Sequence, residues 1–208
     1  MSTSVNIMIP AFEQVYAEFA ECLVKAVQYN QSRDIRTNVS FLAGSYISQA
    51  RRELAQQFMK SEDEWAFWID GDMKFPADAI ERMISRDKNI IGCNYRRRRY
   101  PKTTFTAANG NLMNLIEVQT TDASPDVEKV DYLPGGMMLV HRSAYEALSW
   151  PYYAVQYNPR FNLEVGEDYF FCEKARGVGL ELWIDHGVSR DVSHIGAFSY
   201  SCNLPFKS

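Results

Sequence analysis

The chain has 208 residues, of which 46% are hydrophobic and 23% charged, and its formal net charge is −4. This composition is typical of a folded globular domain and excludes a disordered chain, and no run of about 18 apolar residues suggests a membrane-spanning helix. The mild negative charge argues against broad electrostatic attraction to nucleic acid. We expect one soluble domain over residues 1–208 in the cytoplasm, since no secretory signal pattern opens the sequence.

The first half of the chain alternates strand and helix patterns. Short apolar runs are each followed by apolar residues at helical spacing, and this alternation predicts parallel strands with helices packed on both sides. The expected strands are residues 5–9, 39–42, 65–69 and 89–93, and the expected helices cover residues 15–27, 47–58 and 76–84.

The second half contains shorter strand patterns among Gly, Asn, Asp and Pro, so the sheet is expected to become mixed there. We expect strands at residues 112–118, 129–132, 137–140 and 180–184, and helices at residues 143–148 and 166–175, the second closed by Gly177. Residues 150–165 lack clear periodicity and are interpreted as a functional loop. The predicted fold class is therefore α/β, a single Rossmann-like domain with a mostly parallel central sheet and a mixed C-terminal half.

The four cysteines are not arranged as a metal or disulfide framework. They stand far apart in the sequence and form no C-x-x-C pair. We therefore expect reduced thiols, and three of them lie within apolar patterns, as buried thiols do. The four are Cys22, Cys93, Cys172 and Cys202.

The segment Phe67-Trp-Ile-Asp-Gly-Asp-Met-Lys-Phe-Pro76 leads an apolar strand directly into two carboxylates, Asp70 and Asp72. Residues two apart in an extended segment project to the same side, roughly 6.6 Å apart along the backbone, so both could bind one cation. Oxygen ligands suit Mg²⁺ or Mn²⁺ and leave coordination positions for phosphates. The alternative is an ordinary acidic turn, because Asp-Gly is a common turn dipeptide.

Several polar and aromatic residues follow the predicted parallel strands, at the edge where ligands bind in open α/β sheets. Pro10 ends the first strand and the two aspartates end the third. Arg51, in the second helix, could bind phosphate oxygens, although a solvated basic face is an equal alternative. Phe12 or Tyr46 could stack on a nucleotide base.

Two further groups could carry chemistry. Glu167 and Asp168 follow Gly166 at a helix start, where they either cap the helix or direct one carboxylate into a cleft as a general base. His194 is a candidate third metal ligand if the end of the chain folds back to Asp70.

Taken in order, these motifs resemble the GT-A fold glycosyltransferases, specifically the small soluble kind of bacteria and bacteriophages, over most of the chain. The set is fairly specific, although each piece alone is weak. The resembling pieces are Asn6-Ile-Met-Ile-Pro10, Tyr46-Ile-Ser-Gln-Ala-Arg51, Phe67 to Pro76, Leu133-Pro-Gly-Gly-Met-Met-Leu-Val-His141, Gly166-Glu-Asp168 and Ser193-His-Ile-Gly196.

The resemblance implies an enzyme that moves a sugar from a nucleotide-sugar donor, most commonly a UDP-sugar, to an acceptor hydroxyl. Asp70, Gly71 and Asp72 would meet the metal-bound diphosphate, with His194 as the third metal ligand, and about residues 1–100 would form the nucleotide-binding half. Asp168, in an x-Glu-Asp motif with Glu167, would be the base of an inverting reaction in the acceptor-binding half, about residues 101–208. The backbone of Gly135 and Gly136 would form the wall between the donor and acceptor pockets.

The acceptor is left open by the sequence. The chain lacks the Gln-x-x-Arg-Trp signature of processive synthases, which favours a single-addition enzyme. If the basic run of residues 96–99 lines the acceptor side, with Tyr95 and Tyr100 for stacking, a modified DNA base or another phosphate-bearing molecule fits. If that run faces solvent, a saccharide or protein hydroxyl fits as well, with Tyr152, Tyr153 and Tyr157 as a sugar platform.

Two other functions compete with the transferase. A nucleotidyltransferase also uses paired carboxylates, a divalent ion and a nucleotide, but it is expected to carry a Gly-rich basic loop where this chain has Pro10-Ala-Phe-Glu13. A non-catalytic nucleotide-binding module would keep the crevice without turnover.

Overall fold

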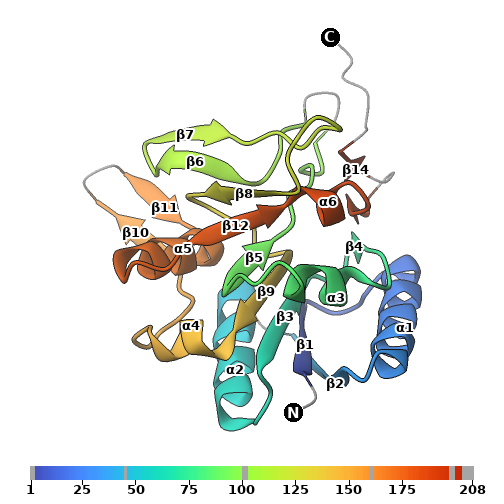
Figure 1. The fold of residues 1–208 in the computed structure, drawn as a ribbon. Coiled ribbons are helices and arrows are strands. Elements are labelled where there is room, and N and C mark those ends of the chain that lie inside the picture. Colours follow the sequence, from blue (N-terminus) through green and yellow to red (C-terminus); the bar gives the residue numbers. More distant parts are fainter. Residues whose placement is uncertain (1–2, 45, 100–102, 160–161, 197–199, 203–208) are drawn as a thin grey trace.

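The computed structural model describes residues 3–44, 46–99, 103–159, 162–196 and 200–202. A central sheet of seven strands runs through it in the order β2-β1-β3-β9-β5-β12-β8, drawing strands from both halves of the chain (Figure 1). The seven are β1 (Ser4–Ala11), β2 (Arg36–Ala43), β3 (Trp65–Ile69), β5 (Ile90–Gly92), β8 (Val127–Val130), β9 (Met137–His141) and β12 (Leu182–Asp185).

Five of these seven strands run in the same direction. β2, β1 and β3 are parallel neighbours, and β5 is parallel to β12, whereas β9 lies antiparallel between β3 and β5. β8 is antiparallel to β12 at the other edge. The predicted fold class, α/β with a mostly parallel central sheet that becomes mixed in the C-terminal half, is confirmed.

Helices cover both faces of the sheet because successive strand residues point to opposite sides. On β3, Phe67 and Ile69 pack in a core with α1 and α3, while Ala66 and Trp68 pack in a second core with α2 and α5. The helices are α1 (Ala17–Ser32), α2 (Ile47–Lys60), α3 (Ala79–Ile84), α4 (Arg142–Glu146), α5 (Glu167–Gly177) and α6 (His186–Ser189). In the described residues, no helix is both long and apolar enough to span a membrane.

The structure differs from three local predictions. Residues 112–118 are not one strand: β6 (Ala108–Asn111) and β7 (Asn114–Glu117) form a hairpin, and the Asn111 side chain accepts the N–H groups of Met113 and Asn114 in its turn. The expected loop at 150–165 holds a second hairpin, β10 (Gln156–Asn158) with β11 (Leu163–Val165). Gly177 is the last residue of α5, and Gly179 takes the left-handed conformation (φ 83°) instead.

The start of the third helix also differs from its prediction. The third helix starts at Ala79 and not at Pro76, whose carbonyl accepts the Ala79 N–H (3.2 Å) in a preceding turn. The second helix was expected from residue 47, and it begins there.

The end of the chain folds back onto the turn that follows β3. β13 (Ser193–His194) pairs with β4 (Met73–Lys74) and with β14 (Tyr200–Ser201) in a small separate sheet. The Ile195 N–H donates to the Asp72 carbonyl at 2.7 Å. This pairing places His194 beside the acidic segment. His194 was a candidate metal ligand only if the chain folded back in this way.

Arg142 fastens the C-terminal end of α2 to the sheet. Its guanidinium donates to the carbonyls of Phe58 (2.9 Å), Ser61 (2.9 Å) and Asp63 (2.8 Å), and lies 4.6 Å from the centre of the Phe58 ring. We expect Arg142→Met to lower the free energy of unfolding by about 2 to 4 kcal/mol, because it leaves helix-end carbonyls unpaired. Urea denaturation measures this, with the exposed Lys60→Met as control at no more than about 0.5 kcal/mol; equal values for both variants would contradict this role.

Candidate functional site

The two aspartates lie at the carboxyl end of β3, in a turn closed by the Met73 N–H on the Asp70 carbonyl (3.1 Å). The segment is therefore a turn, as the plainer interpretation held, but both carboxylates are partly buried by other segments. The Asp70 N–H donates to the Gly136 carbonyl (3.0 Å), because the antiparallel β9 starts where the parallel β3 ends.

Arg51 is a buried cation at the centre of the site. It is 1% exposed, and its guanidinium pairs with Asp70 Oδ1 (Nη2, 2.7 Å) and Glu167 Oε1 (Nε, 3.3 Å). It also lies 5.3 Å from the centre of the Trp68 ring. The solvated basic face considered from the sequence is wrong. Arg51 Nη1 is buried and has no hydrogen-bond partner within the described residues, so its N–H groups are left for a ligand.

Gly135 and Gly136 are required by the close packing around this cation. A Cβ atom on Gly135 would lie 2.8 Å from Arg51 Nη2, and one on Gly136 would lie 2.2 Å from Tyr95 Oη. The Gly136 N–H donates to that same hydroxyl (3.0 Å). The paired glycines therefore let the start of β9 touch Arg51, Tyr95 and Asp70.

Asp72 is contacted by two side chains from distant parts of the chain. Its Oδ2 lies 3.1 Å from Arg98 Nη2 and 3.3 Å from His194 Nε2. Burial raises the pKa of Asp72, but the hydrogen bond and charge of His194, with the charge of Arg98, hold it below its ordinary value. Burial also raises the pKa of Asp70, against the opposing effect of Arg51.

A divalent cation fits the chemistry of this edge, although the described residues contain no three His, Cys, Asp or Glu side chains already arranged around one point. Asp72 Oδ1 is buried and has no partner within the described residues, which leaves an oxygen for a cation. Asp70 and Glu167 pair with Arg51, Asp72 pairs with Arg98, and Asp168 adds a fourth carboxyl beside Glu167. Carboxylates outnumber the guanidinium groups in these ion pairs, and a divalent cation such as Mg²⁺ or Mn²⁺ would offset the surplus negative charge.

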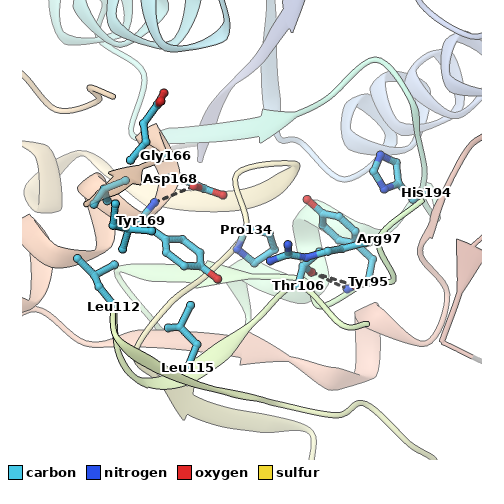
Figure 2. A pocket seen from close by; sticks show the side chains of 13 residues that line it. Tyr95, Arg97, Thr106, Leu112, Leu115, Pro134, Gly166, Asp168, Tyr169 and His194 are labelled. Atoms are coloured by element: carbon cyan, nitrogen blue, oxygen red, sulfur yellow. Dashed lines mark hydrogen bonds between the residues drawn. The ribbon is translucent and has the colours of Figure 1, made fainter. Parts of the chain in front are cut away.

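Asp168 lines a cavity of about 470 Å³, here called the Asp168 cavity, together with residues from β11, α5, the segment after β5 and the chain end (Figure 2). Burial and the neighbouring Glu167 charge raise the pKa of Asp168 to about 6, although the Tyr169 N–H donates to its Oδ1 at 2.8 Å. Glu167 pairs with Arg51 and does not line this cavity. The two neighbouring carboxylates therefore have different surroundings.

A second hollow, the Pro10 cleft, lies on the other side of the aspartates. Two shallow cavities of about 220 and 170 Å³ share Pro10 and Phe12 as lining, and Asp70, Gly71 and Asp72 line the larger one. Tyr46 lines the smaller one. The Phe12 and Tyr46 side chains are 73% and 84% exposed, so both rings are free to cover a planar ligand.

The tyrosines and arginines that were predicted to bind the acceptor differ in their burial and contacts. Tyr153 is fully buried, and its hydroxyl bonds to Tyr145 in the core (2.8 Å), so it cannot form a sugar platform; Tyr157 is exposed. The four arginines of the basic run have separate environments, and Tyr100 lies outside the described residues. Sequence reasoning missed that Arg98 pairs with Asp72 and that Arg97 lines the Asp168 cavity. Residue spacing gave no indication of the bend in the backbone at Arg98.

Comparison with solved structures shows that this fold is shared with A197 from STIV. A197 from STIV matches with a TM-score of 0.64 and 12% sequence identity, over 99% of this chain and 97% of A197. A glycosyltransferase involved in the glycosylation of the major capsid of PBCV-1 matches with a TM-score of 0.39 and 13% identity, over 69% of this chain and 62% of that one. No protein-family model matches the chain, and no curated protein matches its sequence.

We expect Arg51→Met to lower the free energy of unfolding by about 3 to 5 kcal/mol, because it leaves Asp70 and Glu167 buried without a cation. Arg51→Lys keeps the charge but not the two-sided geometry and should lose roughly half as much. Denaturation curves for both are compared with those of Arg52→Met, whose side chain is the next on α2 and only partly buried. Similar losses at positions 51 and 52 would show that the buried pairs are unimportant.

The pKa of Asp168 predicts a pH-dependent stability. Because about 6 lies above the ordinary 3.8, the folded state binds more protons than the unfolded chain between these values, and stability falls as the pH rises through this window. Asp168→Asn removes the penalty, so we expect it to stabilise the fold by about 2 kcal/mol at pH 8 and by less than half of that at pH 4.5. A thermal denaturation series over pH tests this, and a variant that is less stable at pH 8 would refute it.

Proposed function

We propose that this protein is a metal-dependent glycosyltransferase that transfers a sugar from a nucleotide-sugar donor to an acceptor hydroxyl. The observation that carries the proposal is the contact between Asp72 and His194, because Asp72 lines the Pro10 cleft and His194 lines the Asp168 cavity. One acidic centre thus borders two hollows, one flanked by exposed aromatic rings and the other containing a carboxylate suited to be a base. Transfer between two substrates needs this arrangement.

The donor would occupy the Pro10 cleft. Phe12 and Tyr46 would cover the nucleotide base, and a UDP-sugar is the first donor to test. Asp70, Asp72 and His194 would hold Mn²⁺ or Mg²⁺, which when bound stabilises the negative charge of the departing diphosphate. Arg51 would orient Asp70 through Oδ1, and the N–H groups on its Nη1 would be available to a ligand oxygen.

The acceptor would occupy the Asp168 cavity. Asp168 takes the proton of the acceptor hydroxyl, the oxygen forms a bond to the anomeric carbon, and the bond from that carbon to the diphosphate breaks. A carboxyl with a pKa of about 6 is mostly ionised at pH 7 and is a stronger base than an ordinary aspartate. Attack from the side opposite the leaving group inverts the anomeric configuration. Glu167 would act through Arg51 and not as the base.

The four cysteines are free and buried, which suits a reducing compartment such as the cytoplasm.

Donor binding is tested by calorimetry with Mn²⁺ and UDP. We expect binding to require both components and to weaken at least about 10-fold in Asp72→Asn, which removes charge from the proposed metal ligand. The exposed Asp122→Asn is the matched control and should bind like the unchanged protein. Binding that is indifferent to metal, or that falls equally in both variants, would contradict the donor site.

Catalysis is tested by screening nucleotide sugars for slow hydrolysis with Mn²⁺, followed by transfer assays. Asp168→Asn should lower transfer about 10² to 10⁴-fold while UDP still binds, and the rate should rise as the pH increases through about 6, where Asp168 loses its proton. Asp122→Asn, which changes an exposed carboxylate that lines neither the Asp168 cavity nor the Pro10 cleft, is again the control. UDP binding with no hydrolysis of any donor would favour a binding module, and release of pyrophosphate from added nucleoside triphosphates would favour a nucleotidyltransferase.

A further inference from the structure

Arg97 is an exposed, positively charged residue that lines the Asp168 cavity. The Arg97 N–H donates to the Thr104 carbonyl (2.9 Å), and its own carbonyl accepts from the Thr103 hydroxyl (2.6 Å) and the Arg99 N–H (2.7 Å). Its backbone is therefore held on both sides, and the side chain starts from a fixed point. Such preorganisation lowers the entropy that a ligand contact must overcome.

The neighbours of Arg97 in the basic run are already engaged. The Arg96 guanidinium is buried, donates to the Cys202 carbonyl (3.2 Å) and lies 4.5 Å from the centre of the Phe105 ring, and Arg98 pairs with Asp72. Arg97, in contrast, pairs with no carboxylate among the described residues. Its side chain contacts the neutral phenol of Tyr169.

The direction of this side chain brings its charge into the cavity. Figure 2 shows Arg97 pointing from the His194 side of the cavity toward Pro134 and Tyr169, with Asp168 on the far side. A guanidinium binds phosphate or carboxylate oxygens through two parallel N–H groups, so an anion is the natural partner for it.

One part of the wall is aliphatic, although Glu164 and Thr106 also line the cavity. Leu112 and Leu115 come from the β6–β7 hairpin, and Leu163 and Val165 come from β11. A cavity of about 470 Å³ is of the size that takes a single small ligand. Such a surface contacts the carbon face of a sugar ring or a planar base and gives no hydrogen bonds to it.

We propose that the acceptor carries a phosphate group, bound by Arg97, on the same small unit as the hydroxyl that faces Asp168. Its carbon skeleton lies against the aliphatic wall, so a sugar phosphate and a nucleotide share the required chemistry. Arg97 is then a specificity-determining residue for the acceptor. This inference rests on the proposed function only in assigning the ligand the role of acceptor.

The test is calorimetry in buffer with EDTA, so that neither metal-dependent donor binding nor turnover enters the measurement. The probes are ribose 5-phosphate against ribose, and thymidine 5′-monophosphate against thymidine. We expect both phosphates to bind at least about 10-fold more tightly than their neutral partners, and Arg97→Met to lose this advantage. Arg99→Met should keep it, because Arg99 is exposed like Arg97 but does not line the cavity. The tighter of the two phosphates identifies the class of acceptor.

Asp168→Asn locates the binding. Removing a negative charge that shares the cavity should tighten phosphate binding several-fold, whereas an anion bound elsewhere would not respond. Three results would overturn the inference. They are equal binding of the phosphates and their neutral partners, equal effects of the two arginine variants, and no binding at 10 mM probe, which corresponds to a binding free energy weaker than about −2.7 kcal/mol. If the inference fails, donor hydrolysis with transfer to a neutral saccharide would still support the proposed function. Phosphate binding without hydrolysis of any donor would support this phosphate site and contradict the proposed function.

Discussion

The paired contacts of the buried Arg51 guanidinium hold the site together. Asp70 and Glu167 lie on different halves of the chain, and each gives a carboxylate oxygen to Arg51, at 2.7 and 3.3 Å. A buried charge must be paired, so the end of β3 and the start of α5 are brought to one point. Asp168, the next residue after Glu167, lines the neighbouring cavity. The two adjacent carboxylates therefore have different surroundings.

The sheet topology supplies the remaining parts of the site. Because β9 runs against its neighbours, its first residues lie at the same edge as the last residues of β3, and Gly135 and Gly136 pack there without side chains. The pairing of β13 with β4 then adds His194 from the end of the chain. One edge of a sheet thus collects an acidic centre bordered by two hollows, and the proposed transfer reaction needs both hollows at once.

Local patterns predicted much of this fold. The apolar runs at residues 5–9 and 65–69 and the helical stripe at 47–58 correspond to observed elements, because burial on both faces of a parallel sheet leaves a strong signal. The hairpins β6–β7 and β10–β11 were missed, since short turns depend on single polar side chains. The burial of Arg51 depends on Glu167, 116 residues away, and the direction of Arg97 depends on its neighbours across a bend. No spacing within the sequence encodes such contacts.

The central claim is that one divalent cation joins this acidic edge to the diphosphate of a donor. Electron–nuclear double resonance on the protein with Mn²⁺ and UDP tests it directly. The account predicts phosphorus couplings from the diphosphate and a nitrogen coupling that disappears in His194→Ala. A bound Mn²⁺ without phosphorus coupling, or spectra unchanged by the substitutions His194→Ala and Asp72→Asn, would contradict it.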